Sequence, residues 1–202
     1  MLRPTLILLL FFLLACQQKR EKVEQRNEYG ETETYFRDKV DYAKDGLYLR
    51  FNDDDIKVEE AHYNNDTLDG YRILYYENGD TQIVEYYQEG RFEGPFFAYY
   101  DNGQLEIEGQ YVFNEMDGSW KRYYRDGQLM EVVTFRENAE NGPFVEYHPN
   151  GALKAEGTYI NGDGEHGLLK LYDENGELTK TMNCDHGVCR TVWTKEKNTA
   201  DE

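Results

Sequence analysis

Glycine returns at a fixed interval through most of the chain, and the same pattern of hydrophobic and polar positions surrounds it each time. The interval is 24 residues for the first five of these glycines and 25 before the sixth: Gly46, Gly70, Gly94, Gly118, Gly142 and Gly167. Five positions after each glycine stands an aromatic residue: Phe51, Tyr75, Tyr99, Tyr123, Tyr147 and Tyr172. Seventeen positions after it stands a second row: Tyr63, Tyr87, Tyr111, Phe135, Tyr159 and Cys184. A fixed period of this length predicts a repeat architecture.

Each repeat also contains the sequence signal of a tight turn. Eight and nine positions after the glycine come the pairs Asn78-Gly79, Asn102-Gly103, Asp126-Gly127, Asn150-Gly151 and Asn175-Gly176, with Asp54-Asp55 in the first repeat. Asn-Gly between two runs of aromatic and β-branched residues predicts a β-hairpin, because both residues tolerate positive φ. The sequence therefore predicts an all-β fold of about six tandem hairpins over residues 46–193. A lone hairpin is barely stable in water, so each must pack on its neighbours.

Two of the repeats resemble a known family. Residues 94–111 read GPFFAYYDNGQLEIEGQY and residues 142–159 read GPFVEYHPNGALKAEGTY. Both are similar to the MORN-repeat variant of bacterial proteins, and the resemblance covers residues 46–193. It implies an elongated, single-layer antiparallel sheet and no catalytic residues.

The length of the turn decides which side chains share a face of the sheet. A two-residue turn pairs Arg72 with Glu85, whereas a three-residue turn with glycine as the bulge residue pairs Ile73 with Ile83. We favour the three-residue turn, because it places the two most regular aromatic rows on one face. That face is then the core, with small residues such as Gly109 beside the rings.

The opposite face would carry two further sets of aromatic residues. They are Phe96, Trp120 and Phe144, two positions after the glycine, and Tyr76, Tyr100 and Tyr124, six positions after it. These rings occur in the middle repeats and are not needed for the predicted core, so we expect them to bind a partner. The alternative is that they pack on one another or beneath a helix from the N-terminal segment.

The N-terminus has the pattern of an export signal, in which a basic residue precedes an apolar run from Leu6 to Ala15. This run is too short to span a bilayer, for which about 20 residues are needed. The segment Leu13-Leu14-Ala15-Cys16 resembles the lipobox of bacterial lipoproteins. The resemblance implies a signal peptide over residues 1–15 and an acylated Cys16 that enters the lipid bilayer. By analogy with Gram-negative sorting, Gln17 in place of aspartate favours the outer membrane. An ordinary secretory peptide with an incidental cysteine is the alternative.

The segments on either side of the repeats differ from them in composition. Residues 16–45 mix both charge signs without a period, so we interpret them as a charged tether, and we expect residues 194–202 to form a flexible tail. The whole chain carries 22 Lys and Arg against 40 Asp and Glu, a net charge of −18. Nucleic acid is therefore not expected as a partner, and a bare anionic membrane is an unfavourable one.

The remaining chemistry lies near the C-terminus. Cys184 and Cys189 are close in sequence, and in an oxidising compartment they predict a disulfide that braces the last hairpin. The alternative is a metal site that adds His186 to the two cysteines. The four histidines, which are His62, His148, His166 and His186, lie in different repeats and suggest no nucleophile and base. No motif for a metal or cofactor appears, so none is expected.

Together these features predict a non-enzymatic, lipid-anchored scaffold of the bacterial cell envelope that binds a protein or a glycan through its aromatic residues. Two alternatives stay open. One is a metal-dependent, calcium-binding enzyme or hydrolase that works on an acidic edge of the sheet. The other is an antitoxin-like binding protein, because many bacterial members of the family are labelled antitoxins. An envelope lipoprotein could not reach a cytoplasmic toxin, which counts against the second alternative.

Overall fold

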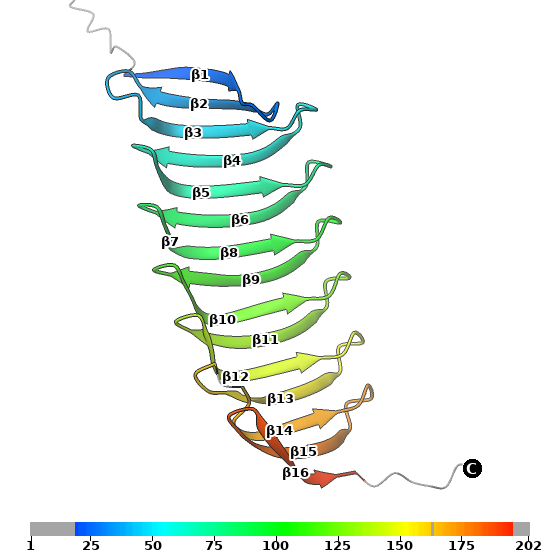
Figure 1. The fold of residues 1–202 in the computed structure, drawn as a ribbon. Coiled ribbons are helices and arrows are strands. Elements are labelled where there is room, and N and C mark those ends of the chain that lie inside the picture. The colour runs from blue at the N-terminus through cyan, green and yellow to red at the C-terminus, as the bar shows by residue number, and fades with distance from the viewer. Residues whose placement is uncertain (1–18, 163, 196–202) are drawn as a thin grey trace, which may run out of the picture.

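A single open antiparallel sheet contains all the strands of the computed structural model, which describes residues 19–162 and 164–195 (Figure 1). Each strand pairs with the strands before and after it in the chain, except β7, which pairs only with β6. The strands are β1 (Arg20–Arg26), β2 (Thr32–Asp38), β3 (Lys44–Phe51), β4 (Lys57–Asn64), β5 (Thr67–Tyr75), β6 (Thr81–Gln88), β7 (Arg91–Phe92), β8 (Gly94–Tyr99), β9 (Leu105–Val112), β10 (Glu115–Tyr123), β11 (Leu129–Arg136), β12 (Ala139–Tyr147), β13 (Leu153–Tyr159), β14 (Gly167–Tyr172), β15 (Leu178–Asp185) and β16 (Val188–Thr194). The predicted all-β, single-layer sheet is confirmed. In this part of the chain no helix has the length and hydropathy that a membrane crossing requires.

The six predicted hairpins are present, and their tips follow one edge of the sheet (Figure 1). They are β3–β4, β5–β6, β8–β9, β10–β11, β12–β13 and β14–β15. At a typical tip, the backbone N–H of Tyr76 donates to the carbonyl of Asp80 at 2.9 Å, and the enclosed Gly79 has a φ of 87°. The tip loop therefore has three residues, as predicted.

The opposite edge is made of two-residue turns that join one hairpin to the next. Both residues of each turn have positive φ, which is the geometry of a type I′ turn. The turns are Asn65-Asp66, Glu89-Gly90, Phe113-Asn114, Glu137-Asn138, Asn161-Gly162 and His186-Gly187. The second residue of each turn donates its N–H to a carbonyl beside the preceding turn, for example Gly90 to Leu68 at 2.8 Å. Successive hairpins are thus linked at this edge as well as along their strands.

A β-bulge behind every tip changes which side chains share a face. Tyr99 pairs with Leu105, but Ala98 pairs with Ile107, so Glu106 is an extra residue. Beyond the bulge the strands pair as a two-residue turn would pair them, and Arg72 lies opposite Glu85. Such a bulge bends the strand and reverses the alternation of its side chains. The prediction that the two regular aromatic rows share one face is therefore wrong.

The buried side chains lie on one side of the sheet, which we call the core face. It carries the row from Tyr63 to Cys184 together with Trp120 and Phe144. Its C-terminal half contributes one buried residue from each of five successive strands: Val133, Phe144, Ala155, Leu169 and Cys184. No large side chain among the described residues is fully buried. A single layer covers a ring only through its neighbouring strands, so the core is a line rather than a centre.

The second regular row, from Phe51 to Tyr172, lies on the opposite face. Three of its tyrosines join a glutamate and a lysine, and the groups repeat in every second hairpin. Tyr123 donates to Glu108 at 2.8 Å, and Lys121 donates to the same carboxylate at 2.7 Å. These two hydrogen bonds lower the pKa of Glu108. The lysine bond is the larger cause. Polar groups thus fill the face that the sequence assigned to the core.

A hairpin precedes the first repeat, where the sequence predicts a tether. Arg20 in β1 pairs with Asp38 in β2, and β2 continues the sheet into β3. Tyr35 of this hairpin is buried against Tyr48 and Ala61. The tether prediction is therefore wrong for residues 20–45, because the first repeat is covered by a degenerate hairpin of its own kind. The predicted signal peptide and Cys16, and residues 196–202 of the predicted tail, lie outside the described residues.

Two glycines of the core face are fixed by packing. A Cβ added to Gly109 would lie 2.2 Å from the indole of Trp120 on the next hairpin, and one added to Gly157 would lie 2.7 Å from Phe144. Neither glycine needs a left-handed conformation. The rings can lie flat over the sheet only because these two positions have no side chain.

Gly109→Ala should therefore destabilise the sheet by about 1–3 kcal/mol, the usual cost of overpacking. In a Trp120→Leu background the same substitution should cost much less, because the indole that it strikes is gone. Urea unfolding of the four proteins of this cycle measures the difference. An equal cost of Gly109→Ala in both backgrounds would show that the indole does not set the requirement for glycine.

A ladder of side-chain hydrogen bonds joins the hairpin tips. The hydroxyl of Tyr76 donates to the carbonyl of Tyr99 at 2.7 Å, and Tyr100 and Tyr124 donate to Tyr123 and Tyr147 at 2.8 Å. In the next repeat, His148 Nε2 donates to the carbonyl of Tyr172 at 3.1 Å. Each rung fastens one tip to the following one.

Replacing Tyr76, Tyr100 and Tyr124 together by phenylalanine should lower the free energy of unfolding by about 3 kcal/mol, since each lost hydrogen bond costs about 1 kcal/mol and the sites are far apart. Tyr71→Phe is the control, because Tyr71 is half exposed and lies outside the ladder. Thermal unfolding followed by circular dichroism compares the two variants. A triple variant as stable as Tyr71→Phe would contradict the role of the ladder.

Candidate functional site

A small groove opens on the core face over strands β9 to β13. Its volume is about 180 Å³. Trp120, Phe135 and Tyr159 line it together with charged Arg122, Glu131 and Glu140. Pockets for drug-sized ligands are typically larger, at roughly 300–1,000 Å³. The groove therefore has room for one side chain or one sugar ring.

Trp120 is the central side chain of the groove. It is only 6% exposed, and its indole packs against Phe96, Tyr111 and Phe135 at centroid distances of 5.6, 5.2 and 6.1 Å. Its Nε1 is buried and has no hydrogen-bond partner among the described residues. A buried donor without a partner costs about 1–3 kcal/mol, and this cost would be recovered if a bound group accepted the hydrogen bond.

The charged residues give the groove an acidic character. Arg122 Nε lies 3.4 Å from Glu131 Oε1, which offsets one of the carboxylates. Burial and then the neighbouring charge of Glu140 raise the pKa of Tyr159 to about 12, so its hydroxyl remains a hydrogen-bond donor at neutral pH. The groove thus combines aromatic surfaces, donor groups and carboxylates, which are the means of recognising a polar ring or a basic side chain.

The structure does not gather the six predicted partner-binding residues into one surface. Trp120 and Phe144 are buried at 6% and 3% exposure, and Phe96 packs on Trp120, so these three rings belong to the core that the sequence placed on the other face. The hydroxyls of the three tyrosines of the set, Tyr76, Tyr100 and Tyr124, are bound to backbone carbonyls at the tips. Only Trp120 of this set lines the groove. The bulge, which moves each second-position ring to the core face, is the physical reason for this correction.

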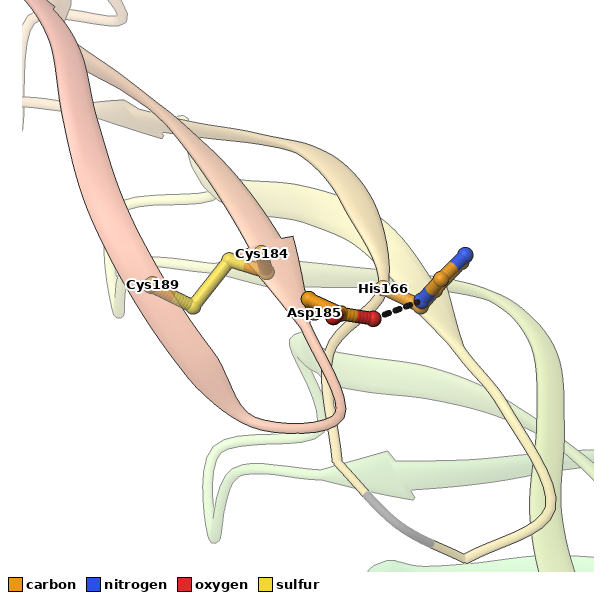
Figure 2. The surroundings of a disulfide bond; sticks show 4 residues. All are labelled: His166, Cys184, Asp185 and Cys189. Atoms are coloured by element: carbon orange, nitrogen blue, oxygen red, sulfur yellow. Dashed lines mark ion pairs between the residues drawn. A yellow bond between two sulfur atoms is a disulfide. The ribbon is translucent and has the colours of Figure 1, made fainter.

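The end of the sheet holds the two cysteines and two of the four histidines. Cys184 and Cys189 form a disulfide between β15 and β16 (Figure 2). Their sulfurs are therefore not free to bind a metal with His186. His166 and His186, which lie in different repeats, meet beside Asp185. Sequence reasoning missed this contact, and its one signal was the spacing of 25 rather than 24 residues before Gly167.

The comparison with protein families agrees with this architecture. The profile of the MORN repeat variant matches four segments of the chain, residues 92–112, 116–137, 140–161 and 165–183. Each segment contains the strands of one hairpin. The chain therefore carries four repeats of this variant, and the fold and the matches together define a tandem-repeat scaffold. No curated protein matches the chain.

Proposed function

We propose that the protein is a non-enzymatic scaffold of the bacterial cell envelope, anchored to the outer membrane by acylated Cys16, which binds an envelope protein or glycan in the groove around Trp120. The unpartnered Nε1 of Trp120 is the observation that carries the binding site. The groove offers a ligand two aromatic walls and a donor that the fold itself does not satisfy. A bound sugar ring or side chain would supply both the stacking and the acceptor.

The position of the first strand supports anchoring close to the bilayer. Only Gln17 and Gln18 separate Cys16 from Lys19, a span of at most about 11 Å in an extended chain. Lys19, Lys22 and Lys39 line a surface hollow beside β1. These cations suit lipid phosphates in spite of the net negative charge of the chain, since attraction at a membrane surface acts within a Debye length. The sheet would then project its long axis, and the groove, away from the membrane.

Reversing the charges of the groove should abolish binding of the partner. The variant Arg122→Glu with Glu140→Lys changes the groove without changing the net charge. Gln110→Glu with Thr158→Lys is the matched control, because both residues are exposed on the opposite face. We expect wild type and control to retain the same cross-linked envelope protein, or to sediment equally with purified peptidoglycan sacculi.

The groove variant should lose at least about 90% of that binding, a change of about 1.4 kcal/mol or more. Mass spectrometry of the cross-linked material identifies a protein partner, and sedimentation with sacculi identifies a glycan. If the groove variant bound as well as the control, the groove would not be the binding surface. Circular dichroism of both variants checks that the sheet is intact.

The anchor has a separate test. Cys16→Ala should leave the protein in the aqueous phase or uncleaved, whereas the wild type should enter the detergent phase, because two or three acyl chains hold a protein in a membrane stably. Phase partition of cell extracts measures this. Equal partition of the two proteins would refute lipid anchoring and leave the groove hypothesis untouched.

A further inference from the structure

Three metal-ligating side chains converge at the C-terminal end of the sheet. His166 precedes β14, and Asp185 and His186 stand at the turn between β15 and β16. One potential ligand atom from each lies within 4.8 Å of the other two. His166 Nδ1 lies 3.5 Å from Asp185 Oδ1, as the dashed line in Figure 2 shows, and His186 Nδ1 lies 2.7 Å from the same oxygen. Two imidazoles thus flank one carboxylate.

The backbone holds the two loops of this cluster together. Gly187 donates its N–H to the carbonyl of Glu165 at 3.0 Å, which is the last link along the edge of two-residue turns. A Cβ added to Gly164 would lie only 2.9 Å from the Cα of Gly187, so the two loops are in close contact. The Cys184–Cys189 disulfide closes the turn that carries Asp185 and His186 (Figure 2). The positions of the three side chains are therefore fixed before any ion binds.

The departure from the repeat period creates the cluster. The five preceding intervals between equivalent glycines suffice for a two-residue turn and a strand, but the sixth is one residue longer. With the extra residue, the loop before β14 places His166 next to the following turn. His166 Nδ1 is buried there and accepts or donates no hydrogen bond among the described residues. Packing alone does not account for an imidazole nitrogen that is left without a partner.

We propose that His166, Asp185 and His186 bind a zinc ion. Imidazole nitrogens suit zinc, whereas calcium and magnesium prefer sites built of oxygen atoms alone. Ligand atoms of a tetrahedral zinc site lie about 3.4 Å apart, given bonds of about 2.1 Å. The spacing of His166 from Asp185 already matches this distance, and the hydrogen bond between Asp185 and His186 would give way to the ion.

Three protein ligands leave at least one coordination position open. The side chains of Asp185 and His186 are 79% and 56% exposed, so water or a group from another molecule can reach that position. Structural zinc sites are usually closed by four protein ligands, whereas open sites bind a further ligand. The site would thus give the end of the sheet farthest from β1 a metal-dependent contact, distinct from the aromatic groove.

Zinc titration of the full chain without a histidine tag tests the proposal. Isothermal calorimetry in excess Mg²⁺, which occupies the diffuse acidic surface, should show one zinc ion per chain. His166→Ala and His186→Ala should each weaken binding by more than about tenfold, since even the loss of an outer partner of a ligand costs 10–100-fold. His62→Ala is the matched control, because His62 lies in β4 and should leave the affinity unchanged.

Asp185→Asn guards against a distorted turn, because the amide keeps the shape of the side chain and should still lose affinity. Cobalt in place of zinc reports the same site, and the histidine variants should lose its visible absorption. Absence of stoichiometric uptake by the wild type would overturn the proposal. So would full affinity in Asp185→Asn and the two histidine variants, or an equal loss in His62→Ala.

Discussion

Packing between successive hairpins is the interaction on which the rest of this structure depends. A single-layer sheet has no second layer to cover its rings, so a ring is buried only where it lies over the adjacent strand. Trp120 lies over Gly109 of the preceding hairpin, and Gly157 lies between Phe144 and Leu169. The two ladders, one through the tyrosines at the tips and one through the two-residue turns, hold the hairpins at the spacing that this packing needs. Stability in such an array is a sum of contacts between neighbours.

The same constraint explains where function can reside. The core face is closed by neighbours in the plane of the sheet but is open above it, so a groove forms where the rings and charges of several hairpins leave space. Trp120 belongs both to the core and to this groove, which links binding to folding. At the two ends of the sheet the constraint differs, because the end hairpins lack a neighbour. The end with β1 and β2 carries cations near the predicted anchor, and the other end carries a disulfide and paired histidines.

Much of the fold could be predicted from the sequence, because a glycine every 24 residues and an Asn-Gly pair have one structural meaning each. The tip loops and the order of the hairpins follow from them. The faces could not be predicted, since the bulge at positions such as Glu106 has no residue type of its own and reverses the side chains beyond it. The hairpin of β1 and β2 was missed because it has no Asn-Gly pair, although Gly30 continues the spacing of the tips. The site at Trp120 depends on those faces, and the meeting of His166 with His186 depends on one inserted residue, so neither could be predicted from the pattern alone.

If contacts between neighbouring hairpins hold the sheet together, one whole repeat can be removed without loss of the fold. Deleting residues 118–141 joins Asp117 to Gly142, preserves the period and brings Phe144 over Gly109 in the place of Trp120. Small-angle X-ray scattering of the deleted chain should give a folded particle whose longest dimension is shorter by about 10 Å, the width of two strands. A scattering curve of an unfolded chain, or an unchanged longest dimension, would contradict this account.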